Sequence, residues 1–117
     1  RLTIQAYFHS RYKAMFKQLI TPQSLKNFAG DISFHRGEDY YRRGLVQRLH
    51  DSGNKISGVV LGNQPYQVVL EYKNDRLLSH CSCPRAADGY FCKHSVALGL
   101  AWLDDTSAKA QSVEMHT

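Results

Sequence analysis

The sequence lacks the signatures of several protein classes. Its 117 residues contain no apolar run of about 18 residues, so no membrane-spanning helix is expected. The first residues lack the apolar stretch of a signal peptide. No Walker-type phosphate loop, nucleophile elbow or metalloprotease helix occurs, and these are the motifs of common catalytic sites. We therefore predict a protein without catalytic activity or a small-molecule substrate.

Cysteine is also scarce, and its number is odd. A framework of disulfides pairs an even number of cysteines in a small secreted chain, whereas this chain has three cysteines in 117 residues. Reduced thiols are typical of the cytosol, so we expect a cytoplasmic protein.

Positive charge is concentrated in the first half of the chain. Residues 1–60 hold ten Lys and Arg against four Asp and Glu, whereas residues 61–117 hold five against six. The length fits one domain with a core of modest size. A basic surface on the N-terminal part is therefore expected, and such surfaces favour contact with the phosphates of nucleic acids.

All three cysteines lie in one short segment together with a histidine. Cys81 and Cys83 are two residues apart, and Cys92 and His94 repeat this spacing after eight intervening residues. Side chains two apart on a strand point to the same face, so Cys81 and Cys83 can bind one ion. Three thiolates and one imidazole complete a tetrahedral zinc site and leave no position open. The motif over residues 81–94 thus predicts one structural Zn²⁺.

Other uses of these residues are less favoured. Cys92 as a nucleophile with His94 as its base would need side chains that face each other, which residues two apart on a helix do not. An iron–sulfur cluster would usually bind four cysteines. His80 directly precedes Cys81 and points to the opposite face of the predicted strand, so we do not expect it to be a ligand.

The hydrophobic periodicity predicts an α+β fold. Helical spacing predicts a helix over residues 2–20, a second one from Pro22 to Gly30 with Thr21 as N-cap, and a third over 33–43 capped by Asp31 or Ser33. A period of two then predicts the four strands of a small antiparallel meander, at 45–50, 55–61, 66–72 and 76–83. A zinc-clamped C-terminal helix at 95–103 completes a single domain over residues 1–103, and the polar residues 104–117 are predicted to be a disordered tail.

The Cys-x-Cys and Cys-x-His pairs and the apolar helix after them resemble the SWIM zinc-finger domain. Residues 34–46 are similar to the lead-in of bacterial SWIM proteins and of the N-terminal regions of bacterial Swi/Snf-type helicases. The resemblance covers roughly residues 21–103. It implies a zinc-binding interaction module whose partner is DNA, with a protein–protein adaptor without a nucleic-acid role as the alternative. Because the sequence begins with Arg1 rather than methionine, we expect a fragment that is monomeric by itself. The resemblance implies a larger helicase-related or SWIM protein as the parent chain, and an ATP-dependent helicase is one candidate for it.

Four basic residues are candidates for contact with DNA, and two tyrosines near them are candidates for base stacking. The candidates are Arg36, Arg42, Arg43 and Arg48, with Tyr40 and Tyr41. The alternative is a solvated basic face with the tyrosines in the core. In that case Gly37 allows close helix packing and Arg36 pairs with a carboxylate. Arg85 and Lys93 are expected to offset the negative charge of a zinc ion bound by three thiolates, and the alternative is that they face a ligand beside the zinc together with Lys73. Trp102 is expected in the core.

Overall fold

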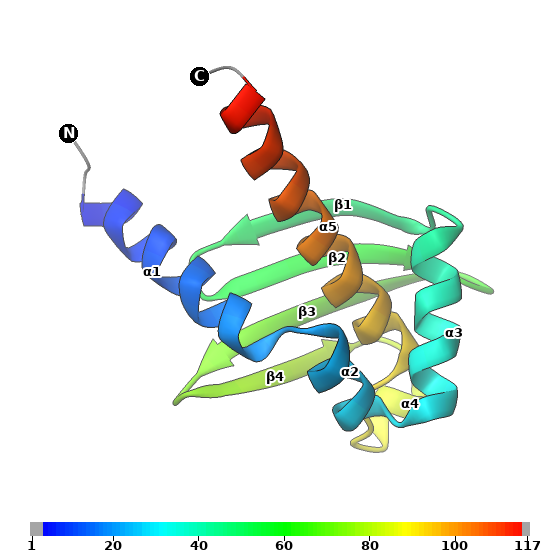
Figure 1. Ribbon diagram of the computed structural model, residues 1–117. Coiled ribbons are helices and arrows are strands. Elements are labelled where there is room, and N and C mark those ends of the chain that lie inside the picture. The colour runs from blue at the N-terminus through cyan, green and yellow to red at the C-terminus, as the bar shows by residue number, and fades with distance from the viewer. Residues whose placement is uncertain (1–3, 116–117) are drawn as a thin grey trace.

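Helices cover one face of an antiparallel sheet in the computed structural model, which describes the backbone of residues 4–115 and the side chains of residues 11–106 (Figure 1). The helices are α1 (Ile4–Leu19), α2 (Pro22–Ala29), α3 (Asp31–Arg42), α4 (Pro84–Ala87) and α5 (Lys93–Met115). The strands are β1 (Val46–Ser52), β2 (Lys55–Leu61), β3 (Pro65–Lys73) and β4 (Arg76–Cys81), and they pair in sequence order. The predicted α+β fold, with its N-terminal helices, meander and C-terminal helix, is confirmed.

The junctions of the first three helices follow from their capping residues. Thr21 accepts a hydrogen bond from the backbone N–H of Ser24, and the Ser24 side chain accepts one from the N–H of Thr21, so α2 begins with a capping box. Gly30 ends α2 at a φ of 84°, a conformation that favours glycine. The predicted cap of α3 by Asp31 or Ser33 was wrong. Gly30 itself is the N-cap, so no side chain caps this helix.

The edge strand β1 contains a bulge. Gln47 pairs with Val59 and His50 pairs with Ser57, so β1 has one more residue than β2 between these pairs. Arg48 adopts a φ of 55° at this point. The extra residue lets both Val46 and Leu49 pack against the core although they are three residues apart.

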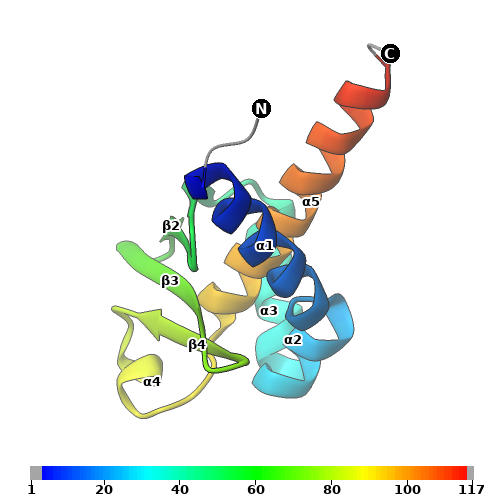
Figure 2. The ribbon, with the colours of Figure 1, turned by 90° about the vertical axis from the view of Figure 1, so that its left-hand side faces the viewer.

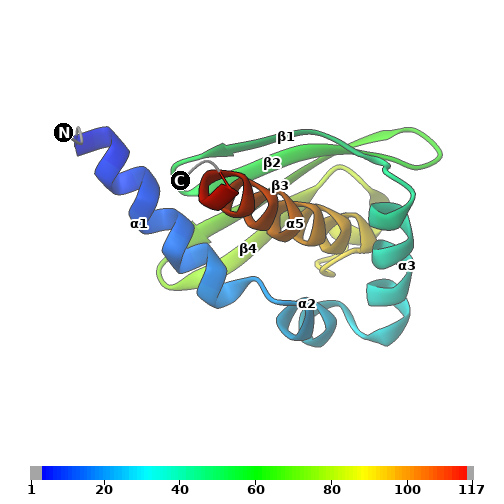
Figure 3. The same ribbon diagram turned by 45° about the horizontal axis from the view of Figure 1, so that its top comes forward.

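Helix α5 lies across the sheet and forms the centre of the core (Figure 3). Trp102 is 1% exposed, stands edge-on to Phe16 with ring centroids 5.9 Å apart, and donates a 3.1 Å hydrogen bond from Nε1 to Asp51 Oδ2. Its expected place in the core is thus confirmed. Seen from the side in Figure 2, α1, α3 and α5 all lie on one side of the sheet. No helix of the described chain is long and apolar enough to cross a membrane.

Helix α3 packs closely against the first turns of α5, and Gly37 permits this. A Cβ atom at Gly37 would lie 2.5 Å from the carbonyl oxygen of Lys93 and 2.5 Å from Cβ of Val96. Both distances are well below ordinary contact. The expected packing role of Gly37 is therefore confirmed, and it brings α3 next to the two C-terminal ligands of the predicted zinc site.

Helix α5 is longer than the sequence predicted. It was expected to end at residue 103, before a disordered tail, but it continues to Met115. The prediction of its end was wrong because residues 104–115 contain no Gly or Pro to stop a helix. Thr106 is buried and donates a 3.0 Å hydrogen bond to the carbonyl of Leu103. Residues 116–117 of the expected tail lie outside the described residues, and a domain boundary at residue 103 stays a prediction.

Candidate metal centre

The four predicted ligands come from one end of the sheet and the start of α5. Cys81 ends β4, Cys83 is the N-cap of α4, Cys92 directly precedes α5, and His94 lies in the first turn of α5. The placement of Cys83 on the fourth strand was wrong. Pro84 begins a short helix there, and Cys83 Sγ caps it by accepting a 3.4 Å hydrogen bond from the N–H of Ala86.

The four side chains converge on a single point. Their ligand atoms all lie within 4.8 Å of one another, and three of the four residues are buried. Cys81 Sγ lies 3.7 Å from His94 Nδ1. A tetrahedral zinc site, with bonds of about 2.0–2.3 Å, separates its ligand atoms by about 3.5–3.8 Å. The site has the size and the Cys₃His donor set for one zinc ion, which would hold β4, α4 and α5 together.

The contacts between the thiols favour deprotonation at Cys92. A hydrogen bond from Cys81, assisted by hydrogen bonds from His94 and Ser95, lowers the pKa of Cys92 although burial opposes this. The hydrogen bond to Cys92, followed by burial, raises the pKa of Cys81. These contacts therefore favour a thiolate at Cys92 and a thiol at Cys81, whereas zinc binds cysteines as thiolates and so releases protons on binding.

Ser95 contacts the ligand Cys92 from the protein interior, a role that was not predicted from the sequence. Its side chain is fully buried, its Oγ lies 3.5 Å from Cys92 Sγ, and it shares a hydrogen bond with the hydroxyl of Ser79 on β4. Such outer contacts fix the orientation of metal ligands. The available signal was a polar residue, placed directly after His94, at the start of an otherwise apolar helical stretch.

His94 is enclosed by aromatic rings. It is 3% exposed, stacks on Tyr66 with ring centroids 4.3 Å apart, and lies 5.4 Å from the ring of Tyr40. Its Nε2 is buried and has no hydrogen-bond partner among the described residues. Its Nδ1 makes the long, 3.7 Å contact with Cys81 Sγ. A buried imidazole with so few hydrogen bonds is unfavourable unless it binds a ligand, which supports a metal at this position.

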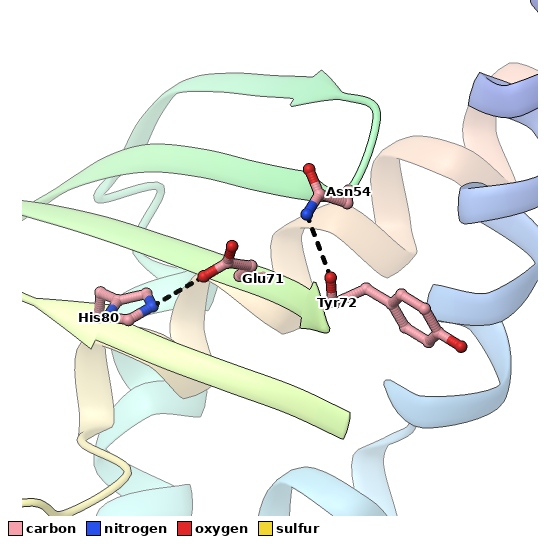
Figure 4. A network of polar contacts seen from close by, with 4 residues as sticks. All are labelled: Asn54, Glu71, Tyr72 and His80. Carbon is pink, nitrogen blue, oxygen red and sulfur yellow. Dashed lines mark hydrogen bonds and ion pairs between the residues drawn. The ribbon is translucent and has the colours of Figure 1, made fainter. Parts of the chain in front are cut away.

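His80 is separate from the cluster. Its Nε2 lies 3.1 Å from Glu71 Oε1 on the neighbouring strand, and the side chain is 59% exposed (Figure 4). In the same view, the side-chain amide of Asn54 donates a 3.2 Å hydrogen bond to the carbonyl of Tyr72 and ties the first hairpin to β3. His80 thus belongs to a cross-strand contact with Glu71 rather than to the metal site.

The four candidate arginines lie in different settings. Arg42 is 3.3 Å from Glu38 and Arg43 is 3.5 Å from Asp39, both one turn apart on α3. Arg48 is exposed at the bulge of β1. Arg36 lines a cavity beside the metal site. Tyr40 and Tyr41 are half-buried against the core, as the alternative reading expected.

This cavity has a volume of about 840 Å³. The corner between α2 and α3 forms one wall, and three of the metal ligands, Cys83, Cys92 and His94, form another. The charged side chains around it are Arg36, Arg85, Lys93 and Asp31. Arg85 and Lys93 were expected mainly to offset the charge of the metal site, with a ligand beside the zinc as the alternative. Their grouping with Arg36 was not predicted, because it depends on the docking of α3 against α5.

Comparison with known proteins gives one result. Residues 66–102 match the family model of the SWIM zinc finger, and this segment runs from β3 to the middle of α5 and contains all four ligands. No curated protein and no solved structure matches the chain at a significant level.

Proposed function

Because residues 66–102 form a SWIM zinc-finger domain, we propose that the protein is a noncatalytic DNA-binding module. The zinc ion fixes β4, α4 and α5 relative to one another. The cations around the adjacent cavity contact the phosphates of the nucleic acid. The similarity of residues 34–46 to a helicase lead-in extends the proposal to a helicase-related parent chain, in which this module would bind DNA beside a motor domain.

The observation that carries this proposal is the convergence of three cations on one cavity. Arg36, Arg85 and Lys93 line it, and within residues 11–106 none of the three forms an ion pair with a carboxylate. Arg42 and Arg43, in contrast, are paired on their own helix. Unpaired cations at one place are typical of surfaces that bind phosphate.

The net charge around the cavity is positive even when the neighbouring negative charges are counted. A zinc ion with three thiolates carries about one negative charge, and Asp31 adds another. The three cations therefore leave an excess of about one positive charge at the cavity, so Arg85 and Lys93 do more than neutralise the metal. The uncapped first turn of α3 borders the same cavity, and its free N–H groups add a favourable field for an anion.

A charge-matched pair of variants tests this function. Zinc-loaded protein is titrated with DNA over a series of salt concentrations, using the wild type, Arg36→Ala/Arg85→Ala and the control Arg42→Ala/Arg43→Ala. Each double variant removes two positive charges. We expect the first pair to weaken binding strongly and to reduce the salt slope by about 1.4–1.8, the share of two phosphate contacts.

The control pair is expected to change binding far less, because its charges are already offset on α3. Equal weakening by both pairs would favour the wider surface predicted from the sequence, with Arg42, Arg43 and Arg48 included. If the wild type binds no DNA even at low salt, DNA binding is refuted. The adaptor alternative then predicts a protein partner whose affinity changes little with salt.

A further inference from the structure

The cavity beside the metal centre has an apolar rim as well as its cations. Among the described side chains, three large apolar residues are exposed, namely Ile32 at 73%, Tyr90 at 57% and Phe28 at 48%. One of them lines this cavity, and the other two adjoin residues that line it. Ile32 lines it, Phe28 precedes the lining residue Ala29, and the ring of Tyr90 lies beneath Arg85. Apolar side chains gathered at one place on a surface mark a binding site.

The rim residues are held in position by their neighbours. The guanidinium carbon of Arg85 lies 4.4 Å from the centroid of the Tyr90 ring. The Phe28 ring lies 5.4 Å from that of Phe91, at an interplanar angle of 35°. The second contact connects α2 with the loop before α5. Because both rings are held by a neighbour, a base that stacks on a face left open would cost little further loss of side-chain freedom.

Exposed rings beside unpaired cations are the combination that binds unpaired nucleotides. The cations contact the phosphates, and the bases stack on the rings regardless of their sequence. The cavity volume of about 840 Å³ lies within the range of roughly 300–1,000 Å³ that is usual for small-ligand pockets. It is thus far larger than a metal ion or a single phosphate needs.

We propose that this cavity binds unpaired nucleotides of a single DNA strand, with phosphate beside Arg36 and Lys93 and a base against the rim of Phe28 and Tyr90. This inference rests on the proposed DNA-binding function and narrows it to single strands. In an intact duplex each base is stacked between its neighbours, so its face is not accessible to Tyr90. Only the phosphates of a duplex can therefore contact the cavity.

The test separates base stacking from charge. Zinc-loaded protein is titrated by fluorescence anisotropy with a labelled oligothymidine of about ten nucleotides, which lies within the usual range of site sizes. An abasic strand of the same length and a duplex of the same sequence are titrated in parallel. Stacking of one base corresponds to roughly five- to hundredfold in affinity. We expect the oligothymidine to bind tighter than both other ligands by a factor in this range.

Two variants connect the effect to the rim. Tyr90→Leu should remove most of the difference between oligothymidine and the abasic strand. Tyr90→Phe keeps the ring and should retain the difference. Because Tyr90 is more than half exposed in a loop, both variants should keep the zinc content and melting temperature of the wild type, and these are measured on the same samples.

The outcomes separate this inference from the function on which it rests. If the duplex or the abasic strand binds as tightly as the oligothymidine, the single-strand inference is overturned while DNA binding stands. If Tyr90→Leu and Tyr90→Phe behave alike, the rim is not the stacking surface and the inference also fails. If the wild type binds none of the three ligands at low salt, both proposals fail. Binding of an acidic peptide with apolar side chains would then assign the same cavity to a protein partner.

Discussion

Replacing Gly37 by alanine is a sharp test of how this domain holds its metal centre. In the interior of an ordinary helix, this substitution stabilises by about 1 kcal/mol, because alanine loses less backbone entropy than glycine. Here, however, the added Cβ would lie 2.5 Å from the Lys93 carbonyl oxygen and 2.5 Å from Val96 Cβ. Ordinary contacts between carbon atoms are about 3.5–4.0 Å. Two opposed effects therefore act on one methyl group.

The steric effect should be larger than the gain in helix propensity. Inserting a methyl group into a well-packed interior typically costs about 1–3 kcal/mol, and more where the surroundings cannot move. The Lys93 oxygen belongs to the backbone and cannot rotate away, so α3 and α5 must separate. We expect a net loss of about 1–2 kcal/mol, which for a domain of this size lowers the melting temperature by roughly 4–8 °C. Since Lys93 stands between the ligands Cys92 and His94, zinc affinity should fall as well.

Thermal unfolding of the zinc-loaded protein and competition with a chromogenic chelator measure the two effects. His35→Ala is the matched control, because His35 is exposed on the same helix and should change stability by less than about 0.5 kcal/mol. Combining Gly37→Ala with Val96→Ala should not restore stability, because alanine keeps the Val96 Cβ at 2.5 Å and leaves the Lys93 oxygen in place. A Gly37→Ala protein that melts at or above the wild-type temperature would refute the close packing of α3 on α5.

Three further predictions concern the metal centre. Removing zinc with a chelator should unfold the end of the sheet and the start of α5. The fluorescence of the buried Trp102 should then shift to longer wavelength, and Cys92 should become reactive to alkylation. A Cys92 thiol that is equally reactive with the metal bound would contradict the Cys₃His site. Acidification should also release zinc and unfold this region. The lowered pKa of Cys92 stabilises the fold above the usual thiol pKa, and this stabilisation is lost as the pH falls. A zinc content that stays constant far into the acid range would contradict this prediction. Ser95→Ala should weaken zinc binding by about 10- to 100-fold, as measured by the same chelator competition. The control Ser52→Ala, at the exposed end of β1, should leave zinc binding unchanged.

The zinc ligands could be predicted from the sequence because their geometry is local. Two pairs with one intervening residue each, joined by a short link, have few ways to approach one ion, and the structure brings all four together. The caps of α2 were also readable, since Thr21, Pro22 and Gly30 act through contacts with their own neighbours. The placement of Cys83 failed for a local reason, because a residue directly before Pro84 is as suited to cap a helix as to end a strand.

The cationic cavity could not be predicted, because it depends on tertiary packing. Arg36 comes beside Lys93 through the docking of α3 against α5, and the sequence shows only a glycine that permits this approach. Arg42 and Arg43 were grouped with Arg36 because they are close in sequence. One to two helical turns further along α3, however, their partners are the carboxylates of Glu38 and Asp39.

The bulge in β1 also bears on how copies of this protein meet in solution. β1 is an edge strand, and a regular edge exposes a row of N–H and C=O groups to which a strand of another copy can add. At Arg48 the left-handed backbone interrupts this row, and the long cationic side chain is exposed at the same point. Strand addition along this edge is therefore disfavoured both by broken hydrogen-bond register and by charge repulsion between copies. A feature that first serves to turn Leu49 towards the core thus also protects the molecule against edge-to-edge aggregation.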